Sequence, residues 1–419
     1  MTGLPIVILG AGPAGLAAAA AASCDGQAVV LVDENPAPGG QIWRGGAPQW
    51  SDPRAARLWQ VLAARPHVRL LLGARVLACG APGTLLLDTP DGPRTLAWER
   101  LVMCSGAREL LLPFPGWTLP GVTGAGGMQA LVKGGMPVAG QRVVVAGSGP
   151  LLLAVADTLQ RNGARVLGIA EHRSGAELAR FGARLALRHP RKMAQALRLF
   201  AGLRRVPYLR GASVREARGD ERLASVVLEH GGRVNEMECD FLACGFGLLP
   251  MLELAGLLGC AVEQGRVRVD GQQRTSVAGV WAAGESTGIG GVDKALAEGH
   301  IAGLAATGKA PGAAGQKALA SAQAFARLLA HSFAPAPALR GLCTPSTIVC
   351  RCEDVRAADL APHPGWRAAK LQTRAGMGPC QGRVCGAACG FLYGWEDAGA
   401  RPPVFPASAA TLASVVVPD

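Results

Sequence analysis

The sequence contains few aromatic residues, and no long apolar segment runs through it. Aromatic residues make up 5% of the 419 residues, and only two of them are tyrosines. A paired arginine and tyrosine that would hold a substrate carboxylate is not evident, so we expect no clamp of this kind. No apolar stretch reaches the roughly 18 residues that a transmembrane helix needs. A membrane span is therefore not expected either.

Motifs for hydrolysis and for triphosphate binding are also missing. There is no Ser–His–Asp grouping, no HExxH sequence and no P-loop, and none of the seven histidines has a metal-spaced partner. His300 is expected to be packed or solvated, and we assign no residue as a general acid or base. The chain enters an apolar strand at Leu4–Leu9 without a basic region or cleavage pattern, so no secretory signal is indicated. We expect a cytoplasmic protein whose twelve cysteines are reduced.

The net charge of +12 raises the question of nucleic-acid binding, but its distribution does not favour that function. Much of the excess falls between Arg173 and Arg218, where apolar residues recur at helical spacing. The basic side is either a solvated surface or a docking surface for an acidic protein. No aromatic interleaving or nucleic-acid module is recognisable, so nucleic acid is not an expected partner. The buried side of these helices is expected to carry Leu185, Leu187, Met193, Leu197, Leu199 and Leu203.

The N-terminal segment carries a dinucleotide-binding pattern. Residues 5–34 form an apolar strand, an alanine-rich helix and a second strand, in the sequence PIVILGAGPAGLAAAAAASCDGQAVVLVDE. Gly10 would allow the tight turn, Gly12 the approach of a pyrophosphate to the backbone, and Gly15 close packing of helix on strand. The N-terminus of the helix favours phosphate binding. Because strand, helix and glycines all have the required order, a first nucleotide fold is predicted.

Further segments indicate that this first fold binds FAD. An acid at the end of the second strand, either Asp33 or Glu34, is expected on a ribose hydroxyl. The segment VWAAGE at 280–285 resembles one that lies along the ribityl and pyrophosphate groups in many flavoenzymes, where Glu285 would bind a ribityl hydroxyl. The alternative for Glu285 is an ordinary acid at the entry of a helix. Other expected contacts to FAD come from Pro13, Ala14, Gly39, Gly40, Gln41, Arg44, Val76, Ser105, Gly106, Ala107 and Gly284.

A second, weaker fingerprint follows at residues 142–171. Strand, helix and strand are again present with Gly147-x-Gly149, but Leu152 stands where the third glycine is expected. A second nucleotide fold is therefore predicted, and its occupant stays open between NADH, ATP and none. Glu171 would repel the 2′-phosphate of NADPH, so a nicotinamide partner would be NADH.

Four cysteines near the C-terminus have the spacing of a metal-binding set. The pairs are Cys350-x-Cys352 and Cys380-x4-Cys385, with 27 residues between them. Each [2Fe–2S] cluster needs four ligands, usually thiolates. Zinc sites more often use C-x2–4-C pairs and include histidine. A cluster is therefore predicted, with zinc or unmetallated thiols as the alternatives. Glycines that allow N–H groups to approach sulfur surround the set, namely Gly376, Gly378, Gly382 and Gly386.

The remaining cysteines are expected to have other roles. Cys239-x4-Cys244 has the spacing of a redox pair, but strand alternation places the two on opposite faces, which disfavours a disulfide. Cys343 and Cys389 flank the quartet and are the first candidates to replace one of its members. The others lie in apolar runs and are expected to be small core residues: Cys24, Cys79, Cys104 and Cys260.

The predicted fold class is α/β, with two Rossmann-like dinucleotide-binding domains in the disulfide-reductase-like flavoprotein arrangement. The second domain is inserted in the first, and a small α-rich [2Fe–2S] domain ends the chain. The expected domains are 1–120 with 272–312 for FAD, 121–271 for the second nucleotide fold, 313–345 for a helix and linker, and 346–419 for the cluster.

Several stretches together resemble the α subunits of multimeric bacterial flavin dehydrogenases. That family includes hydrogen cyanide synthase, opine oxidases, D-hydroxyproline dehydrogenase and dye-linked L-proline dehydrogenase. Its C-terminal unit is similar to the bacterioferritin-associated-ferredoxin type of [2Fe–2S] domain, which carries over to the four cysteines above. The resemblance covers nearly the whole chain and rests on PAPGGQIWR (36–44), residues 105–135, VAGSGPLLLAVA (145–156), CGFGLLP (244–250), VCRCEDV (349–355) and TRAGMGPCQGRVCG (373–386).

The resemblance implies an electron relay. Substrate would be oxidised by an oxidase-like β subunit with its own FAD, often with a small ferredoxin-like γ subunit, and this chain would pass electrons to an external acceptor. Two other hypotheses stay open. One is a self-sufficient NADH-dependent reductase of ferredoxin-like carriers, and the other is a structural subunit with vestigial cofactor sites. The sequence does not indicate which amine or amino acid is the substrate.

Overall fold

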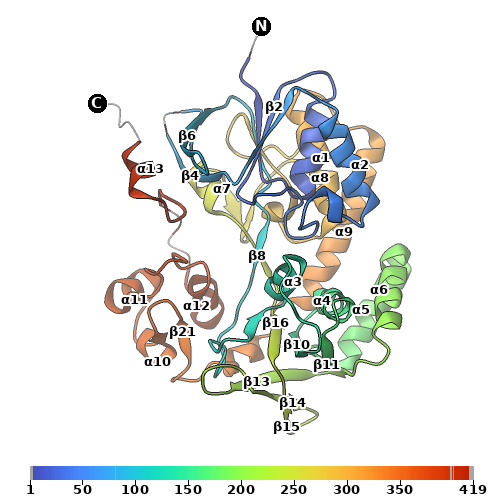
Figure 1. The fold of residues 1–419 in the computed structure, drawn as a ribbon, viewed down its shortest axis with the longest axis vertical. Coiled ribbons are helices and arrows are strands. Elements are labelled where there is room, and N and C mark those ends of the chain that lie inside the picture. The colour runs from blue at the N-terminus through green and yellow to red at the C-terminus, as the bar shows by residue number, and fades with distance from the viewer. Residues whose placement is uncertain (1–2, 81, 397–398, 400, 415–419) are drawn as a thin grey trace. The chain divides into compact units, whose positions relative to one another are not determined.

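The chain forms two compact units, each built around its own parallel sheet (Figure 1). The computed structural model describes residues 3–80, 82–396, 399 and 401–414. Unit 1 comprises residues 1–108, 249–327 and 399–419, and unit 2 comprises residues 109–248 and 328–398. The predicted insertion of one nucleotide fold into another is confirmed, because residues 109–248 of unit 2 interrupt the sequence of unit 1.

Four of the five strands in the sheet of unit 1 are fully buried, and the edge strand Val68–Leu72 is only partly buried. The strands of this sheet are parallel and run in the order β20-β7-β1-β2-β3. Strands buried on both sides read as apolar runs rather than alternating patterns, as IVIL and VVLVD do here. The strands are β1 (Ile6–Leu9), β2 (Val29–Asp33), β3 (Val68–Leu72), β7 (Leu101–Met103) and β20 (Val280–Ala282).

Two small-residue helices, α1 (Pro13–Ala22) and α8 (Val292–Ala306), pack directly on each other beside this sheet (Figure 1). A Cβ added at Gly299 would lie 2.1 Å from the backbone oxygen of Ala14, and one at Gly303 would lie 2.3 Å from that of Ala18. The alanine-rich sequence of α1 and these glycines therefore allow the two backbones to touch. The contact holds the segment 280–291 next to the first glycine-rich turn.

The rest of unit 1 surrounds this core. Asp52 caps α2 through the N–H of Arg54. The other elements are η1 (Ala47–Gln49), α2 (Pro53–Ala63), the antiparallel strands β4 (Arg75–Cys79), β5 (Thr84–Thr89) and β6 (Gly92–Ala97), α7 (Glu253–Leu257), β18 (Val262–Glu263), β19 (Arg266–Val267), η2 (Gly284–Thr287) and α13 (Ala409–Ala413).

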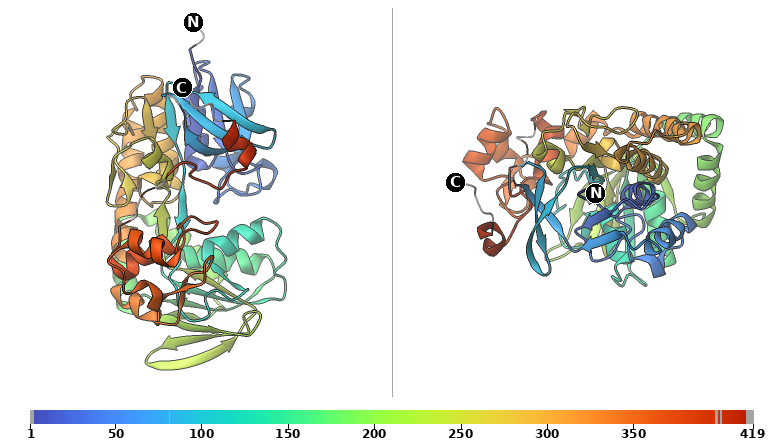
Figure 2. Two further views of the ribbon diagram at one scale, coloured as in Figure 1. Left: turned by 90° about the vertical axis from the view of Figure 1, so that its left-hand side faces the viewer. Right: turned by 90° about the horizontal axis from the view of Figure 1, so that it is seen from above.

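Unit 2 repeats the parallel arrangement with strand order β12-β11-β10-β16-β9. A three-stranded antiparallel sheet, the twisted lime ribbon in Figure 2, extends from it. The elements are β9 (Val122–Gly124), α3 (Ala125–Lys133), β10 (Arg142–Gly147), α4 (Leu151–Arg161), β11 (Arg165–Glu171), α5 (Gly175–Arg188), α6 (Pro190–Gly202), β12 (Tyr208–Arg210), β13 (Ala212–Arg218), β14 (Ser225–His230), β15 (Arg233–Glu238) and β16 (Phe241–Gly245).

The C-terminal part of unit 2 has its own small core, around Val349, Leu360 and Trp366. Helix α9 (Ala313–Phe333) leads into it from unit 1, and β8 (Ala107–Glu109) and β17 (Leu248–Pro250) are the other connections along the chain. Its elements are η3 (Pro337–Leu342), β21 (Ile348–Cys350), β22 (Val355–Arg356), α10 (Ala357–Leu360), α11 (Trp366–Thr373) and α12 (Cys385–Tyr393).

Helices α5 and α6 depart from the prediction in one respect. The amphipathic pattern was expected to bury Leu187 and Leu197, but these side chains are 83% and 60% exposed. The prediction is confirmed for Leu185 and Leu203, which are buried. Helix α6 has no fully buried residue, so its apolar side is only partly covered by the chain itself. None of the helices in the described ranges combines the length and apolar character needed to cross a membrane.

Candidate cofactor sites

The first glycine-rich turn fits its glycines tightly. Gly10 has φ +102°, and a Cβ there would lie 2.3 Å from the backbone oxygen of Cys104. A Cβ at Gly15 would lie 1.7 Å from the oxygen of Gly10. Any side chain at either position would push helix and strand apart, so these glycines do what the fingerprint predicts.

Gly12 is different, because it faces open space. The nearest atom to a Cβ at Gly12 is the Cα of Gly40, at 3.8 Å. The N–H of Gly12 meets no acceptor in the part of the chain that the structure describes. Gly39 anchors the neighbouring loop by donating its N–H to the oxygen of Ala11 at 2.8 Å. Gly12 at the start of α1 therefore offers a free donor and an uncovered backbone, as a pyrophosphate site requires.

The two candidate ribose acids have separate roles. Asp33 is 7% exposed, and its Oδ2 accepts the N–H of Ala11 at 2.6 Å. Its other oxygen accepts the backbone and side-chain N–H groups of Asn35. Glu34 is exposed and pairs with Arg75 at 3.1 Å. Because Asp33 is engaged in holding the turn, Glu34 is the acid available for a ligand.

Arg44 leaves a buried donor unsatisfied beside this turn. Its Nη2 donates to Gln41 Oε1 at 3.0 Å, but its Nε is buried without a hydrogen-bond partner among the described residues. Trp43 is buried and donates its indole N–H to Asp52. Val76 lies on β4 with its side chain in the apolar core, so only its backbone could contact a cofactor.

Residues 104–107 form the turn that connects β7 to β8. Ser105 donates its hydroxyl to the oxygen of Met251 at 3.0 Å. Gly106 has φ +76°, which favours glycine, and Ala107 begins β8. Cys104 is buried, and burial raises the pKa of its thiol, so it is a neutral core residue as predicted.

Glu285 lies against the N-terminus of α8. Its carboxylate accepts the N–H of Gly290 at 3.1 Å and that of Gly291 at 2.7 Å. Burial raises the pKa of Glu285, while Lys294 acts in the opposite direction. The acid therefore caps the helix, which is the alternative role expected for this position.

A buried ion pair beneath this segment was not recognised in the sequence. Lys294 and Glu298 are 4% and 1% exposed, and their charged atoms lie 2.7 Å apart. Lys294 also donates to the oxygen of Gly284 at 2.8 Å and to Thr287 at 2.7 Å. Glu298 accepts the N–H of Gly284 at 2.9 Å. The i, i+4 spacing in DKALAEG was visible, but only the fold shows that the pair is buried and fixes the Gly284 turn.

The second glycine-rich turn is held by Glu171. This side chain is fully buried, and it accepts hydrogen bonds from Ser148 Oγ at 3.0 Å and from the N–H of Gly149 at 2.9 Å. The N–H of Arg173 and the hydroxyl of Tyr208 also donate to it. Burial raises the pKa of Glu171. Since all these donors lie within the chain, Glu171 holds the turn, and its effect on the choice between NADH and NADPH stays a prediction.

Gly149 and Leu152 complete this turn. The three atoms nearest to a Cβ at Gly149 all belong to the ring and Cβ of Phe333, at 3.4 to 3.7 Å. Leu152 is fully buried in the core of the second fold and packs close to Gly245. Gly147, with φ +137°, keeps the role of the first glycine of the pattern.

The four C-terminal cysteines form one chain of thiol hydrogen bonds. Cys385, at the start of α12, links to Cys350 and Cys380, and Cys380 links to Cys352. These bonds lower the pKa of Cys350 to about 6 and that of Cys380 to about 4. Cys385 is the shared donor, so its own pKa is raised. The four cysteines are therefore neighbours in the fold, and their binding of a metal ion stays a prediction.

Backbone N–H groups surround these sulfur atoms. Gly376 donates to Cys350 Sγ at 3.5 Å, and Gly382 contributes to the low pKa of Cys380. Gly376 also has to be glycine for a steric reason, because a Cβ there would lie 2.6 Å from the ring of Trp366. A Cβ at Gly378 would instead lie 2.4 Å from that of Cys352. Within the described ranges, no group of three or more His, Cys, Asp or Glu side chains is arranged to hold a metal ion.

The flanking cysteines have different surroundings. Burial raises the pKa of Cys343 to about 11 and that of Cys389 to about 12. Cys389 lies one helical turn after Cys385 and is fully buried in the small C-terminal core. Cys239 and Cys244 are both buried free thiols. None of these cysteines joins the hydrogen-bonded quartet.

Comparison with known proteins identifies the family. A family model described as pyridine nucleotide-disulphide oxidoreductase matches residues 4–299. The chain belongs to this family. The expected oxidoreductase class and the disulfide-reductase-like flavoprotein fold are thereby confirmed. The matched residues include both glycine-rich turns.

Individual relatives extend the similarity to the whole chain. An opine oxidase subunit of Rhizobium meliloti (strain 1021) is 35% identical over 98% of this chain and 99% of that protein. The hydrogen cyanide synthase subunit HcnB of Pseudomonas aeruginosa is 32% identical over 96% of each. The crystal structure of L-proline dehydrogenase from P. horikoshii has the same fold, with a TM-score of 0.70 and 19% identity over 98% of this chain and 79% of that one. These are the kinds of protein that the sequence motifs resemble.

Proposed function

We propose that this chain is the electron-transfer subunit of a heteromeric FAD-dependent dehydrogenase for an amine, amino acid or opine. The observation that carries the proposal is the linkage of Cys350, Cys352, Cys380 and Cys385 in a chain whose first nucleotide fold is open. The full-length relatives are named as subunits of opine oxidase and hydrogen cyanide synthase, which supports a role within a complex.

The first fold is proposed to hold FAD. The N–H and bare backbone of Gly12 would meet the pyrophosphate, Glu34 a ribose hydroxyl, and the segment at Gly284 the ribityl chain. Arg44 Nε would find in the cofactor the acceptor that the chain does not supply. When bound, FAD accepts electrons in pairs and releases them singly. The residues of this site bind and orient the cofactor, and none is placed to act as a general acid or base.

The cysteine quartet is proposed to bind a [2Fe–2S] cluster within a domain of residues 346–419. Such a cluster divides four ligands between two irons, so its ligands need not converge on one point. The thiol contacts that link Cys385 to Cys350 and Cys380, and Cys380 to Cys352, support this assignment. The depressed pKa of Cys350 and Cys380 and the surrounding N–H groups favour thiolates there.

The partners are proposed to be an oxidase-like β subunit with its own FAD, a small ferredoxin-like γ subunit, and an external electron acceptor. Helices α5 and α6 offer a surface for one of them. Glu177 is the only acid between residues 175 and 205. Exposed Leu187 and Leu197 add apolar area, which suits a protein partner with acidic and aliphatic groups. The basic residues of this segment are Arg180, Arg184, Arg188, Arg191, Lys192, Arg198, Arg204 and Arg205.

Substitution of the cysteines tests this assignment. Cys380→Ser should remove the iron, the acid-labile sulfide and the broad visible absorption of the cluster, while FAD content stays unchanged. Cys389→Ser is the matched control, because this thiol is buried nearby but outside the quartet, and it should keep iron. The measurement is iron, sulfide, zinc and FAD in protein purified anaerobically. Equal iron in both variants, or zinc in place of iron, contradicts the assignment.

The main alternative is an NADH-dependent reductase that needs no partner. Two features of the second fold disfavour it, namely Leu152 in place of the third glycine and the ring of Phe333 against Gly149. Purification alone and together with the proteins encoded beside it separates the two functions. The proposal predicts that substrate oxidation needs an oxidase-like subunit, whereas turnover of NADH by the isolated chain would establish the alternative.

A further inference from the structure

We propose that the side chain of Phe333 closes the second nucleotide fold to dinucleotides, so that this residue determines whether the fold binds one. The inference goes beyond the proposed function, because it concerns a different fold and holds whether or not the cysteines bind iron. It rests on three observations within unit 2. These are the position of the Phe333 ring, the way in which that ring is held, and the loss of the N–H donor that a pyrophosphate would use.

The Phe333 ring takes the place at which the backbone would meet a pyrophosphate. The second glycine of the fingerprint has no side chain so that phosphate can approach it. At Gly149, the Cγ and Cδ1 atoms of Phe333 lie 3.4 and 3.5 Å from the position of a Cβ. A Cβ at Gly149 would just touch the ring, so the ring lies directly beyond the bare backbone on the side from which a phosphate would approach. At Gly12 the corresponding space contains no side chain within 4 Å.

Phe333 is held there by one ring contact and by a hydrogen bond to the residue that follows it. It is the last residue of α9, and it packs edge-on against Phe181 of α5, with ring centroids 4.8 Å apart at an interplanar angle of 73°. The next residue, Ala334, accepts a hydrogen bond from Arg173, which follows β11. Edge-to-face packing of two rings stabilises this position beyond the burial of apolar area. Phe333 itself is only partly buried, so a ligand would have to displace it but not unfold the core.

The second turn has also lost the donor that the first turn keeps. The N–H of Gly149 is bound to Glu171 at 2.9 Å, and the next residue, Pro150, has no N–H. Gly149 adopts φ +98°, whereas Gly12 has φ −74°. Helix α4 starts at Leu151, four residues after Gly147, while α1 starts three residues after Gly10. A phosphate at this turn would find a ring, a proline and an N–H that is already bonded.

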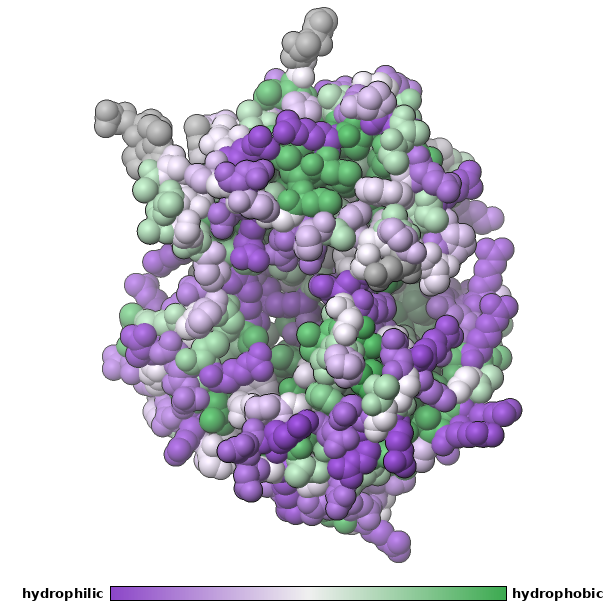
Figure 3. Space-filling model, in the orientation of Figure 1, coloured by the Kyte–Doolittle hydropathy of each residue, from purple (hydrophilic) through white to green (hydrophobic). Residues whose placement is uncertain are grey.

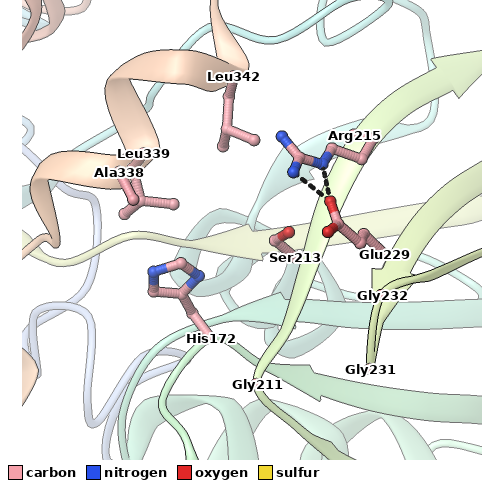
Figure 4. Close-up of a pocket in the computed structure, with 10 residues that line it drawn as sticks. All are labelled: His172, Gly211, Ser213, Arg215, Glu229, Gly231, Gly232, Ala338, Leu339 and Leu342. Carbon is pink, nitrogen blue, oxygen red and sulfur yellow. Dashed lines mark hydrogen bonds and ion pairs between the residues drawn. The ribbon is translucent and has the colours of Figure 1, made fainter.

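A cavity of about 320 Å³ lies elsewhere in the same unit and does not replace this lost position (Figure 4). His172 points into it from the end of β11, at the place that corresponds to Glu34 in the first fold, and Arg215 and Glu229 pair at its edge. The wall opposite His172 comes from η3, with Leu339 and Leu342. Neither Gly149 nor Phe333 lines the cavity. A dinucleotide would have to extend from here across Phe333 to reach the glycine turn.

The test compares binding of ADP-ribose by the FAD-saturated protein and by Phe333→Ala. ADP-ribose carries the pyrophosphate of NADH but no redox group, so calorimetry reports binding without flavin chemistry. If most molecules have the ring in place, the apparent affinity of the wild type is reduced by the open fraction. We expect Phe333→Ala to bind at least about tenfold more tightly than the wild type. Phe325→Ala, on the same helix, is the matched control and should bind as the wild type does.

Two results overturn the proposal. One is equal affinity of the wild type and Phe333→Ala for ADP-ribose. The other is a structure of the wild type with ADP-ribose on Gly149 and Phe333 unmoved. FAD content and thermal unfolding are recorded for each variant. Should Phe333→Ala fail to fold, Phe333→Leu, which keeps an apolar side chain but removes the ring, should show the same direction of change. Because ADP-ribose binding is read without iron or partner, failure here is separate from failure of the proposed function.

Discussion

The two nucleotide folds repeat one strand–helix–strand pattern but differ at its second glycine. Gly12 has an N–H without an acceptor among the described residues and faces no side chain within 4 Å. Gly149 donates its N–H to Glu171 and lies against Phe333. Both turns are otherwise built alike, since a buried acid at the end of the second strand holds each of them. The comparison teaches that the fingerprint specifies the fold, whereas the covering of its second glycine decides the occupant.

The largest expected effect comes from filling the open turn. Gly12→Val should block the approach of the pyrophosphate and yield protein without FAD, at least about a hundredfold weaker in binding, or roughly 2.7 kcal/mol. Gly149→Ala is the control in the closed turn. It should lower stability by about 1–2 kcal/mol, because φ is positive there, but leave FAD content unchanged. Flavin absorbance of the denatured protein measures the FAD content of both variants, and chemical denaturation measures the stability of Gly149→Ala. Normal FAD in Gly12→Val would remove the first fold as its site.

The buried ion pair of unit 1 gives the next effect. Lys294→Met leaves Glu298 buried at 1% exposure without its charged partner, which should cost about 3–5 kcal/mol in the free energy of unfolding. Chemical denaturation provides the measurement. The double variant Lys294→Met with Glu298→Leu should recover most of this loss, since no buried charge remains. A single variant as stable as the wild type would show that the pair does not fix the Gly284 turn.

A smaller, matched pair of effects separates the two turns. Asp33→Asn and Glu171→Gln each turn an amide N–H₂ toward N–H donors, so each should lower stability by about 1–3 kcal/mol. Only Asp33→Asn should also weaken FAD binding, because it disturbs the open turn. The measurement is the free energy of unfolding together with the dissociation constant of FAD. An equal loss of FAD affinity in both variants would contradict the division between the folds.

The basic surface of α5 and α6 should give the smallest effect per residue. Hydrophilic side chains gather over these helices at the right-hand edge of Figure 3. Replacing Arg184, Arg188 and Arg198 by Gln should slow binding to the partner protein and reduce the salt dependence of that binding, at up to about 1 kcal/mol for each exposed contact. The control replaces two exposed arginines outside these helices by Gln, namely Arg94 on β6 and Arg233 on β15. Association with the partner is measured at two salt concentrations. Identical results for the α5/α6 variant and the control variant would show that α5 and α6 form a solvated surface.

The sequence predicted those features that depend on local pattern. The strands, the helices and the glycines of both turns follow from apolar runs and spacing, and Leu152 already marked the second fold as different. Phe333 could not be predicted, because its contact with Gly149 joins residues far apart in the chain. The sequence left Asp33 and Glu34 as equal candidates, and only the hydrogen bond from Ala11 separates them.

The exposed leucines show a second limit. A helical period indicates that one face is apolar, but it does not say whether this chain or another covers that face. Leu187 and Leu197 follow the period and are nevertheless exposed, while Leu185 in the same helix as Leu187 is buried. The depth of Lys294 and Glu298 was hidden for a related reason, since their i, i+4 spacing is also that of an ordinary surface pair.

The most direct test of the account is the source of the electrons. The FAD-loaded chain is mixed anaerobically with NADH in a stopped-flow instrument, and in a second experiment with the oxidase-like partner and the amine or amino acid that this partner oxidises. We predict that NADH leaves the flavin absorbance unchanged over the time of turnover, and that the flavin is bleached only when the partner and substrate are present. Rapid bleaching by NADH in the isolated chain would contradict it.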